Sequence, residues 1–327
     1  MRDFKATAIA IRDMVVRGAG AIGAAAAYGL AQGARAFRGG DPRKFQGHVE
    51  RVFQTLKKAR PTAVDPVNAM TEVRARMAAG ATVPEQQQLA LEAANRFARE
   101  SVEHCEAIGR HGAKLIGAGA KVLTHCNAGW LAFVDVGTAT APMYAAQAKG
   151  TPFHVFCDET RPRSQGATLT AWELAQQGIS HQIIADNAAG FLFSRGQIDL
   201  VIVGSDRTLG RTGEVANKIG TYTKAVLARR HRVPFYVAIP LSTIDWTMKQ
   251  GMEIPIEERD AAEVLGAWGQ TTAGRRQYVR VANPSSGAFN PGFDVTPPEL
   301  ITGIITPAGI FKPKELWAKR RLLGGPR

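Results

Sequence analysis

A thiol and a carboxyl group follow two apolar runs of the chain, where both could take part in acid–base chemistry. Cys126 comes at the end of "KVLTHC" and Asp206 at the end of "DLVIVGSD". A poorly solvated carboxyl group has a raised pKa and can act as an acid or base near neutrality. A thiol beside a cation or a helix N-terminus has a pKa below its usual value of about 8.5. Both residues are therefore candidate catalytic groups; a small buried residue at Cys126 and a helix cap at Asp206 are the structural alternatives.

The other two cysteines and His125 are expected to be structural. Cys105 falls on the apolar stripe of a helix, and Cys157 lies within the apolar run "FHVFC". Adjacent strand residues point to opposite faces, so His125 is not expected to form a dyad with Cys126. The three cysteines form no C-x-x-C pair, and their odd number argues against a disulfide framework and for a reducing compartment.

Three further stretches carry groups suited to a phosphate and to sugar hydroxyls. "RGAGAIG", from Arg17, is typical of a glycine-rich turn that opens a helix, whose free N–H groups and dipole favour an anion. "CDETRPRSQG" places two arginines and Gln165 in one strand-to-helix connection. Asn217 and Lys218 are expected at the start of a further helix, where an amide and a cation can hold an anion. Each stretch has a competing interpretation. These are close packing of small residues at the glycine-rich turn, salt bridges within the strand-to-helix connection, and a Schiff base at Lys218.

Two other classes of ligand fit the sequence less well. Residues 18–23, "GAGAIG", satisfy the dinucleotide pattern G-x-G-x-x-G, but the stretch before them is helix-like and is not the strand that this motif requires. The net charge of +13 and the pI near 10.0 suggest nucleic acid, yet the basic residues are spread along the chain without interleaved aromatic residues. We therefore expect the positive charge to serve solvated faces and a phosphorylated small molecule.

The elements that must position these groups change in type near residue 115. Apolar residues spaced by three and four predict a long helix from Pro84 and, before it, helices around 6–16, 20–37, 43–58 and 65–79. From residue 120, short apolar runs alternate with helix-length stretches, which predicts a Rossmann-like α/β fold with a doubly wound parallel sheet. We expect a small, mainly helical N-terminal domain over 1–115 and a catalytic domain over 116–327. The ligand crevice of such a sheet lies beyond the carboxyl ends of its strands, where the candidate residues fall.

The chain also lacks the apolar segments that membranes and secretion require. Charges at Arg2, Asp3 and Lys5 interrupt the N-terminus, so no signal-peptide core is visible there. No apolar run approaches the roughly 20 residues of a membrane span. We expect a cytoplasmic protein that does not bind a membrane.

These stretches, in this order, resemble the methylthioribose-1-phosphate isomerase family, which is related to the regulatory subunits of translation factor 2B. The matching segments run from near residue 11 to near residue 306 and include "IRDMVVRGAGAIG", "RPTAVD", "THCNAG", "RPRSQGATLT", "DLVIVGSDR", "VANKIGTY", "IPIEERD" and "FDVTPPELITGI". The resemblance implies an aldose–ketose isomerase that converts 5-methylthioribose 1-phosphate to 5-methylthioribulose 1-phosphate in methionine salvage. It also implies a homodimer that uses neither a metal nor an organic cofactor. The spread of the basic residues predicts no nucleic-acid partner.

The resemblance assigns roles to single residues. It implies that Cys126 is the catalytic cysteine and Asp206 the catalytic acid. The residues expected to hold the phosphate and the rest of the substrate are Arg17, Gly18, Ala19, Arg60, Gln165, Asn217 and Lys218.

The sequence departs from the usual family pattern in three places. The chain begins about ten residues before "IRDM", so a strand-containing segment that usually comes first is expected to be absent. Gly20 stands where the family usually has proline, and Trp130, Phe133 and Asp135 replace smaller residues. If these larger side chains line the pocket, the group at sugar C5 differs from methylthio.

Two alternative functions follow from the resemblance. One is the same isomerisation of 5-deoxyribose 1-phosphate, alone or beside the methylthio substrate. The other is a non-catalytic regulator of the translation factor 2B type, and the presence of both Cys126 and Asp206 argues against it.

Overall fold

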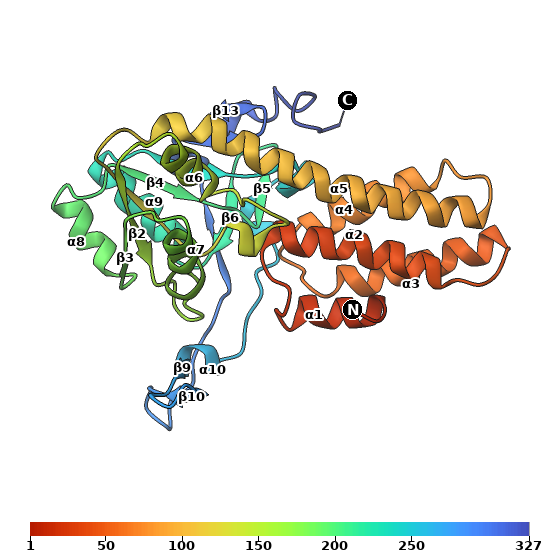
Figure 1. The fold of residues 1–327 in the computed structure, drawn as a ribbon, viewed down its shortest axis with the longest axis horizontal. Helices are drawn as coiled ribbons and strands as arrows, with labels where there is room; N and C mark the ends of the chain where they lie inside the picture. The colour runs from red at the N-terminus through yellow and green to blue at the C-terminus, as the bar shows by residue number, and fades with distance from the viewer. Residues whose placement is uncertain (327) are drawn as a thin grey trace.

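The computed structural model describes residues 1–326, and its N-terminal part is a bundle of five helices. The helices are α1 (Phe4–Arg12), α2 (Ala19–Ala36), α3 (Pro42–Lys57), α4 (Asp65–Met77) and α5 (Val83–Gly112). Asp3 and Asp41 cap α1 and α3 by accepting backbone N–H bonds, and Thr82 forms a capping box with Glu85 at the start of α5. Helix α2 lies inside the bundle, where its many alanines and glycines allow close contact with α4 and α5 (Figure 1).

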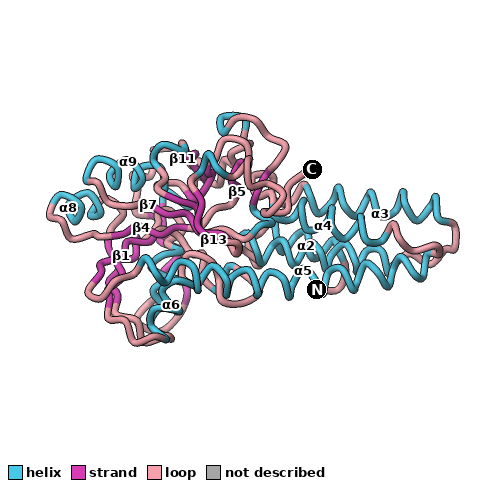
Figure 2. Tube along the Cα trace, turned by 90° about the horizontal axis from the view of Figure 1, so that it is seen from above, coloured by secondary structure: helices cyan, strands magenta, loops and turns pink. Residues whose placement is uncertain are grey.

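Helix α5 connects the bundle to the rest of the protein. It has 30 residues. Phe97 packs in the core of the bundle, whereas Ile108, near the other end, packs against Val122 and Ile202 of the central sheet. The helix therefore extends from one part of the molecule into the other, and Figure 2 shows the bundle and the strands at opposite ends. The division into domains at residue 115 stays a prediction.

The central sheet has seven strands in the order β13-β12-β7-β4-β1-β2-β3. The strands are β1 (Ala120–Thr124), β2 (Phe153–Asp158), β3 (His181–Ile184), β4 (Leu200–Val203), β7 (Phe235–Ala238), β12 (Gly303–Thr306) and β13 (Gly309–Phe311). All neighbours are parallel except β12 and β13. The strand order reverses between β1 and β4, as it does in doubly wound folds.

Helices cover both faces of this sheet. The covering helices are α6 (Ala141–Ala148), α7 (Ala171–Gln176), α8 (Ala188–Ser194) and α9 (Thr221–His231). On one face Leu123 and Val201 pack with Phe193 of α8, whereas on the other Val122 packs with Met143 of α6. Because alternate residues of the inner strands enter different cores, both faces of these strands are buried, which confirms the predicted α/β class.

A smaller sheet lies beside the central one and was not expected from the sequence. It has the order β11-β6-β5-β8, formed by β5 (Arg207–Leu209), β6 (Val215–Lys218), β8 (Ile244–Asp245) and β11 (Phe293–Thr296). Asn217 and Lys218 therefore end a strand, and the prediction that they begin a helix is wrong. Their strand pairs with β11, which is far away in sequence, and Gly220 at φ +101° separates it from α9.

The remaining elements are short. They include the turns η2 (Trp130–Ala132) and η3 (Gly166–Thr170, π-helical), helix α10 (Ala262–Leu265), and the hairpin of β9 (Gly266–Gln270) and β10 (Arg276–Arg280). The hairpin projects away from the body of the molecule (Figure 1). Within residues 1–326, every helix is too short or too polar to cross a membrane.

Candidate active site

The two candidate catalytic residues follow the two strands at which the sheet order reverses. Cys126 comes two residues after β1, and Asp206 comes three residues after β4, its neighbour. In doubly wound sheets a ligand binds in the crevice beyond the strand ends at this point. The topology therefore brings together two residues that are far apart in the sequence.

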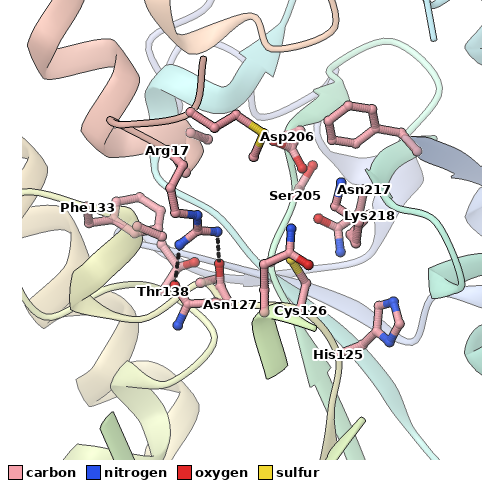
Figure 3. A pocket seen from close by; sticks show the side chains of 18 of the residues that line it. Arg17, His125, Cys126, Asn127, Phe133, Thr138, Ser205, Asp206, Asn217 and Lys218 are labelled. Atoms are coloured by element: carbon pink, nitrogen blue, oxygen red, sulfur yellow. Dashed lines mark hydrogen bonds between the residues drawn. The ribbon is translucent and has the colours of Figure 1, made fainter. Parts of the chain in front are cut away.

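All nine residues predicted for the site line one pocket between the sheet and the helical bundle (Figure 3). These are Arg17, Gly18, Ala19, Arg60, Cys126, Gln165, Asp206, Asn217 and Lys218. Helix α2 enters the pocket with its N-terminus, so its free N–H groups face the same space as the strand ends.

The backbone at Cys126 is held in an unusual conformation. Its φ is +65°, a left-handed value that costs a residue other than glycine about 1–3 kcal/mol. Its N–H donates to Thr160 Oγ1 at 2.8 Å, and its carbonyl accepts from Thr170 Oγ1 at 2.6 Å. The two threonines thus fix the backbone that carries the thiol into the pocket.

Burial raises the pKa of the Cys126 thiol, although Lys218 and Arg17 act in the opposite direction. The cations that were expected to lower this pKa are present, but the loss of solvation outweighs them. Burial likewise raises the pKa of Asp206, opposed by Lys218, Arg60 and Arg17. The site therefore favours a neutral thiol and a protonated carboxyl group, which can donate a proton.

Arg17 is fixed against the loop that follows β1. It donates two hydrogen bonds to Asn127, one to the side-chain oxygen and one at 3.1 Å to the carbonyl (Figure 3). Its Nε is buried and has no partner among the described residues. The next residue, Gly18, has φ +90°, and a Cβ there would lie 2.4 Å from Cα of Ala132. Only glycine allows this close approach of α2 to the loop after β1, at Ala132.

Other polar groups of the pocket also have hydrogen-bonding capacity left for a ligand. Arg60 donates to Glu257 Oε1 at 2.8 Å, but its buried Nη1 has no partner among the described residues, nor has Gln165 Oε1. Lys218 Nζ donates to the carbonyl of Gly292 at 2.9 Å and lies 4.4 Å from the centre of the Phe293 ring. Buried polar groups without partners are rare, so these atoms are available to a bound ligand.

Comparison with known proteins identifies the family. Residues 15–313 match the initiation factor 2 subunit family. Methylthioribose-1-phosphate isomerase of Methylorubrum populi is 50% identical over 311 residues, which cover 93% of this chain and 83% of that protein. The enzyme of the same name from Rhodospirillum rubrum is 50% identical over 328 residues, covering 95% and 81% of the two chains. The chain belongs to the methylthioribose-1-phosphate isomerase family.

Solved structures agree with this membership. The 5-methylthioribose 1-phosphate isomerase of Pyrococcus horikoshii superposes with a TM-score of 0.80 at 40% identity, covering 98% of this chain and 87% of that one. The translation initiation factor eIF-2B subunit delta of A. fulgidus gives a TM-score of 0.77 at 38% identity, covering 99% and 92%. The family fold therefore extends over nearly the whole chain, as the resemblance implied.

Three residues of the loop after β1 differ from the usual family pattern, and two of them lie outside the pocket. Trp130 packs against Tyr144 and Trp172, with ring centres 5.4 Å and 6.1 Å apart, and Asp135 is exposed. Phe133 does line the pocket, and it lies directly against Gly20 of α2. A Cβ at position 20 would be 2.1 Å from Phe133 Cδ1, so the glycine and the large ring occur together for a steric reason.

Sequence reasoning missed several residues of the site. Asn127 and Ser205 flank the predicted catalytic residues at strand ends, where the crevice was expected, but no role was assigned to them. Met14, three residues before Arg17, and Phe293 lie in segments that match the family, but neither has a polar group that would mark it as a site residue.

The carboxylate of Glu173, on α7, was also missed, although it holds the loop that follows Cys126. It is fully buried and accepts from Asn127 Nδ2 at 2.9 Å, Leu131 N at 3.0 Å, Trp130 N at 3.1 Å and Tyr144 Oη at 2.6 Å. A glutamate within the otherwise apolar helix start "TAWEL" is the signal that could have identified it.

Proposed function

We propose that the chain converts 5-methylthioribose 1-phosphate to 5-methylthioribulose 1-phosphate, an aldose–ketose isomerisation of methionine salvage. The observation that carries the proposal is the position of a partly buried acid and a partly buried thiol at neighbouring strand ends, in one pocket with Arg17, Arg60 and Lys218. The relatives that carry this enzyme's name are 50% identical over nearly the whole chain.

Asp206 acts first, as the acid that opens the ring. The phosphate at C1 masks the anomeric carbon, so the ring cannot open as it does in a free sugar. Protonation of the ring oxygen makes it a leaving group. Burial raises the pKa of Asp206, which favours the protonated form that this step requires.

Cys126 then assists the transfer of hydrogen from C2 to C1. It can serve as the base in a route through an enediol phosphate ester, or as a hydrogen-bond donor beside a direct hydride shift. Because burial raises the pKa of the thiol, the free enzyme holds it neutral, which suits the donor role. The left-handed backbone at Cys126 fixes the direction of the sulfur.

The phosphate and the rest of the substrate are bound by seven residues that line the pocket: Arg17, Gly18, Ala19, Arg60, Gln165, Asn217 and Lys218. Within residues 1–326, Arg17 Nε and Arg60 Nη1 are buried donors without partners, and the N-terminus of α2 adds backbone N–H groups. Burial lowers the pKa of Lys218 and of Arg17, and a bound phosphate favours their charged forms. Binding energy at the phosphate positions the sugar for reaction at C1 and C2.

The test is incubation with ribose 1-phosphates that differ at C5, following ketose formation by the wild type and by Cys126→Ser. We expect turnover of the methylthio sugar, and loss of turnover in Cys126→Ser with an unchanged thermal midpoint. Cys157→Ser is the matched control, because Cys157 lies in β2 outside the pocket. Undiminished activity of Cys126→Ser would remove its assigned role.

The same experiment separates the alternatives. Phe133 narrows the pocket, so 5-deoxyribose 1-phosphate is the second candidate substrate, and a higher kcat/KM for it would reverse the assignment. Binding of a sugar phosphate without any turnover would favour a regulator of the translation factor type.

We further propose that the protein is a cytoplasmic homodimer with a domain boundary at residue 115. The support is the family resemblance and the change from helices to a sheet after α5. Light scattering after size-exclusion chromatography tests the dimer, and a mass of one chain would contradict it.

A further inference from the structure

His125 lines the pocket next to Cys126, but its ring is directed away from the thiol (Figure 3). Nε2 faces a carbonyl oxygen, which can only accept a hydrogen bond, and Nδ1 faces the carboxylate oxygen of Asp158 that the Lys224 ammonium also contacts. Nδ1 lies 2.8 Å from Asp158 Oδ2, and Nε2 lies 2.8 Å from the carbonyl oxygen of Ile219. A neutral imidazole has a single N–H and can satisfy only one of them. Both bonds form only when each nitrogen carries a hydrogen, that is, in the imidazolium cation.

The charges around the ring favour the same state. Three carboxylates face this region: Asp158 on the ring itself, Asp186 beside it and Asp294 beyond the Ile219–Gly220 peptide. The cation packed against them is Lys224, whose Nζ lies 3.1 Å from Asp158 Oδ2 and donates to the carbonyl of Asp186 at 2.9 Å. A positive His125 adds the second cation to this buried cluster.

The same cluster has a geometry that resembles a metal site. One ligand atom each from His125, Asp158 and Asp186 lies within 4.8 Å of the others. However, both nitrogens of His125 are already bonded, and the Lys224 ammonium already contacts Asp158. The group is therefore an ion-pair cluster closed by Lys224.

The bond to Ile219 ties together two strand ends that supply the active site. His125 follows β1 and precedes Cys126, whereas Ile219 directly follows Asn217 and Lys218 of β6. Gly220 allows the approach, because a Cβ there would lie 2.9 Å from Cε1 of His125. The N–H of Gly220 in turn donates to Asp294 Oδ2 at 2.7 Å, so the linking peptide is held from both sides.

We propose that His125 is a positioning residue, held as an imidazolium cation between Asp158 and the Ile219 carbonyl, that fixes Asn217 and Lys218 relative to Cys126. The role of His125 in phosphate binding rests on the proposed function. The charge of its ring and its link between the ends of β1 and β6 are independent of that function. His154, on β2, is the natural comparison. Its Nδ1 pairs with Ser180 Oγ at 2.9 Å, its Nε2 has no partner among the described residues, and burial lowers its pKa.

The first test is NMR of the full chain labelled with ¹⁵N-histidine at pH 7.5. Long-range correlations between the carbon-bound ring protons and the ring nitrogens show which nitrogens carry a hydrogen. Signals are assigned by replacing the other histidines one at a time, so no folded His125 variant is needed. We expect two protonated nitrogens at His125 and one unprotonated nitrogen at His154. An unprotonated nitrogen at His125 would overturn the proposal, whether or not the chain turns over the sugar.

The second test is kinetic. We expect His125→Gln to raise KM for the sugar phosphate at least about tenfold with a smaller change in kcat, because Asn217 and Lys218 lose their fixed position. Asp158→Asn keeps the His125 ring but removes the charge of its partner, so KM is expected to rise here too. His154→Gln is expected to change neither KM nor kcat. An unchanged KM in folded His125→Gln and Asp158→Asn, or a loss confined to kcat, would overturn the positioning role.

Discussion

Replacing Gly20 by alanine places a methyl group against the ring of Phe133. The new Cβ would lie 2.1 Å from Cδ1 and 2.5 Å from Cε1 of that ring, well inside van der Waals contact. Overpacking of this kind costs about 1–3 kcal/mol, and the removal of a helical glycine returns at most about 1 kcal/mol. Phe133→Ala alone removes a buried aromatic ring and is expected to cost about 3–5 kcal/mol.

The two changes are expected not to add. In the double variant the alanine at position 20 enters space that the ring has left, so the clash disappears. We expect the double variant to be about 1–3 kcal/mol more stable than the sum of the two single effects predicts. Because Gly20 is in the first turn of α2, Gly20→Ala should also raise KM, and the second substitution should restore part of it.

The assay is urea-induced unfolding of the parent, the two single variants and the double variant. Gly47→Ala is the matched control: it is an exposed glycine within α3, and the nearest atom to its added Cβ is Arg51 Nη1 at 4.0 Å. This control should gain about 0.5–1 kcal/mol. Additivity of Gly20→Ala and Phe133→Ala within about 0.5 kcal/mol would refute the steric account.

Two further variants test buried carboxyl groups. Asp65 is fully buried, its oxygens have no partner among the described residues, and burial raises its pKa from 3.8 to about 7. The free energy of unfolding should therefore fall by at most about 4 kcal/mol as pH rises from about 4 to about 7, and then level off. In urea unfolding, the stability of Asp65→Asn relative to the parent should increase across that pH range. A stability difference that does not depend on pH would contradict this prediction. Glu173→Gln places an amide N–H₂ against backbone N–H donors, which should cost about 1–3 kcal/mol of stability. The thermal midpoint should therefore fall, and KM should rise. An unchanged midpoint would show that the loop does not depend on the carboxylate.

Local patterns were sufficient to predict the long elements. The helix that begins near Pro84 repeats apolar residues at spacings of three and four, and the structure confirms it as α5. The short apolar runs that predicted strands after residue 120 occur as β1, β2, β3, β4 and β7. Such runs between polar ends are typical of strands buried on both faces, as β1 and β4 are.

Contacts between distant residues could not be predicted in this way. Lys218 was placed on a helix because its strand has four residues and pairs with β11, which only the folded chain brings near. Arg60 pairs with Glu257 at a separation of 197 residues, and the fit of Phe133 to Gly20 likewise depends on how α2 meets the loop after β1. The nine residues named from the sequence line one pocket, but the effect of burial on the pKa of Cys126 and Asp206 follows only from the fold.

The most direct test of the proposed chemistry is the turnover of Asp206→Asn measured together with its dissociation constant for the substrate. If Asp206 is protonated in the active enzyme, asparagine is a neutral group of the same shape that lacks the acidic proton. We expect kcat to fall about 10²–10⁴-fold while the dissociation constant changes only a few-fold. A kcat within about tenfold of the parent would contradict the assignment of Asp206 as the acid that opens the ring.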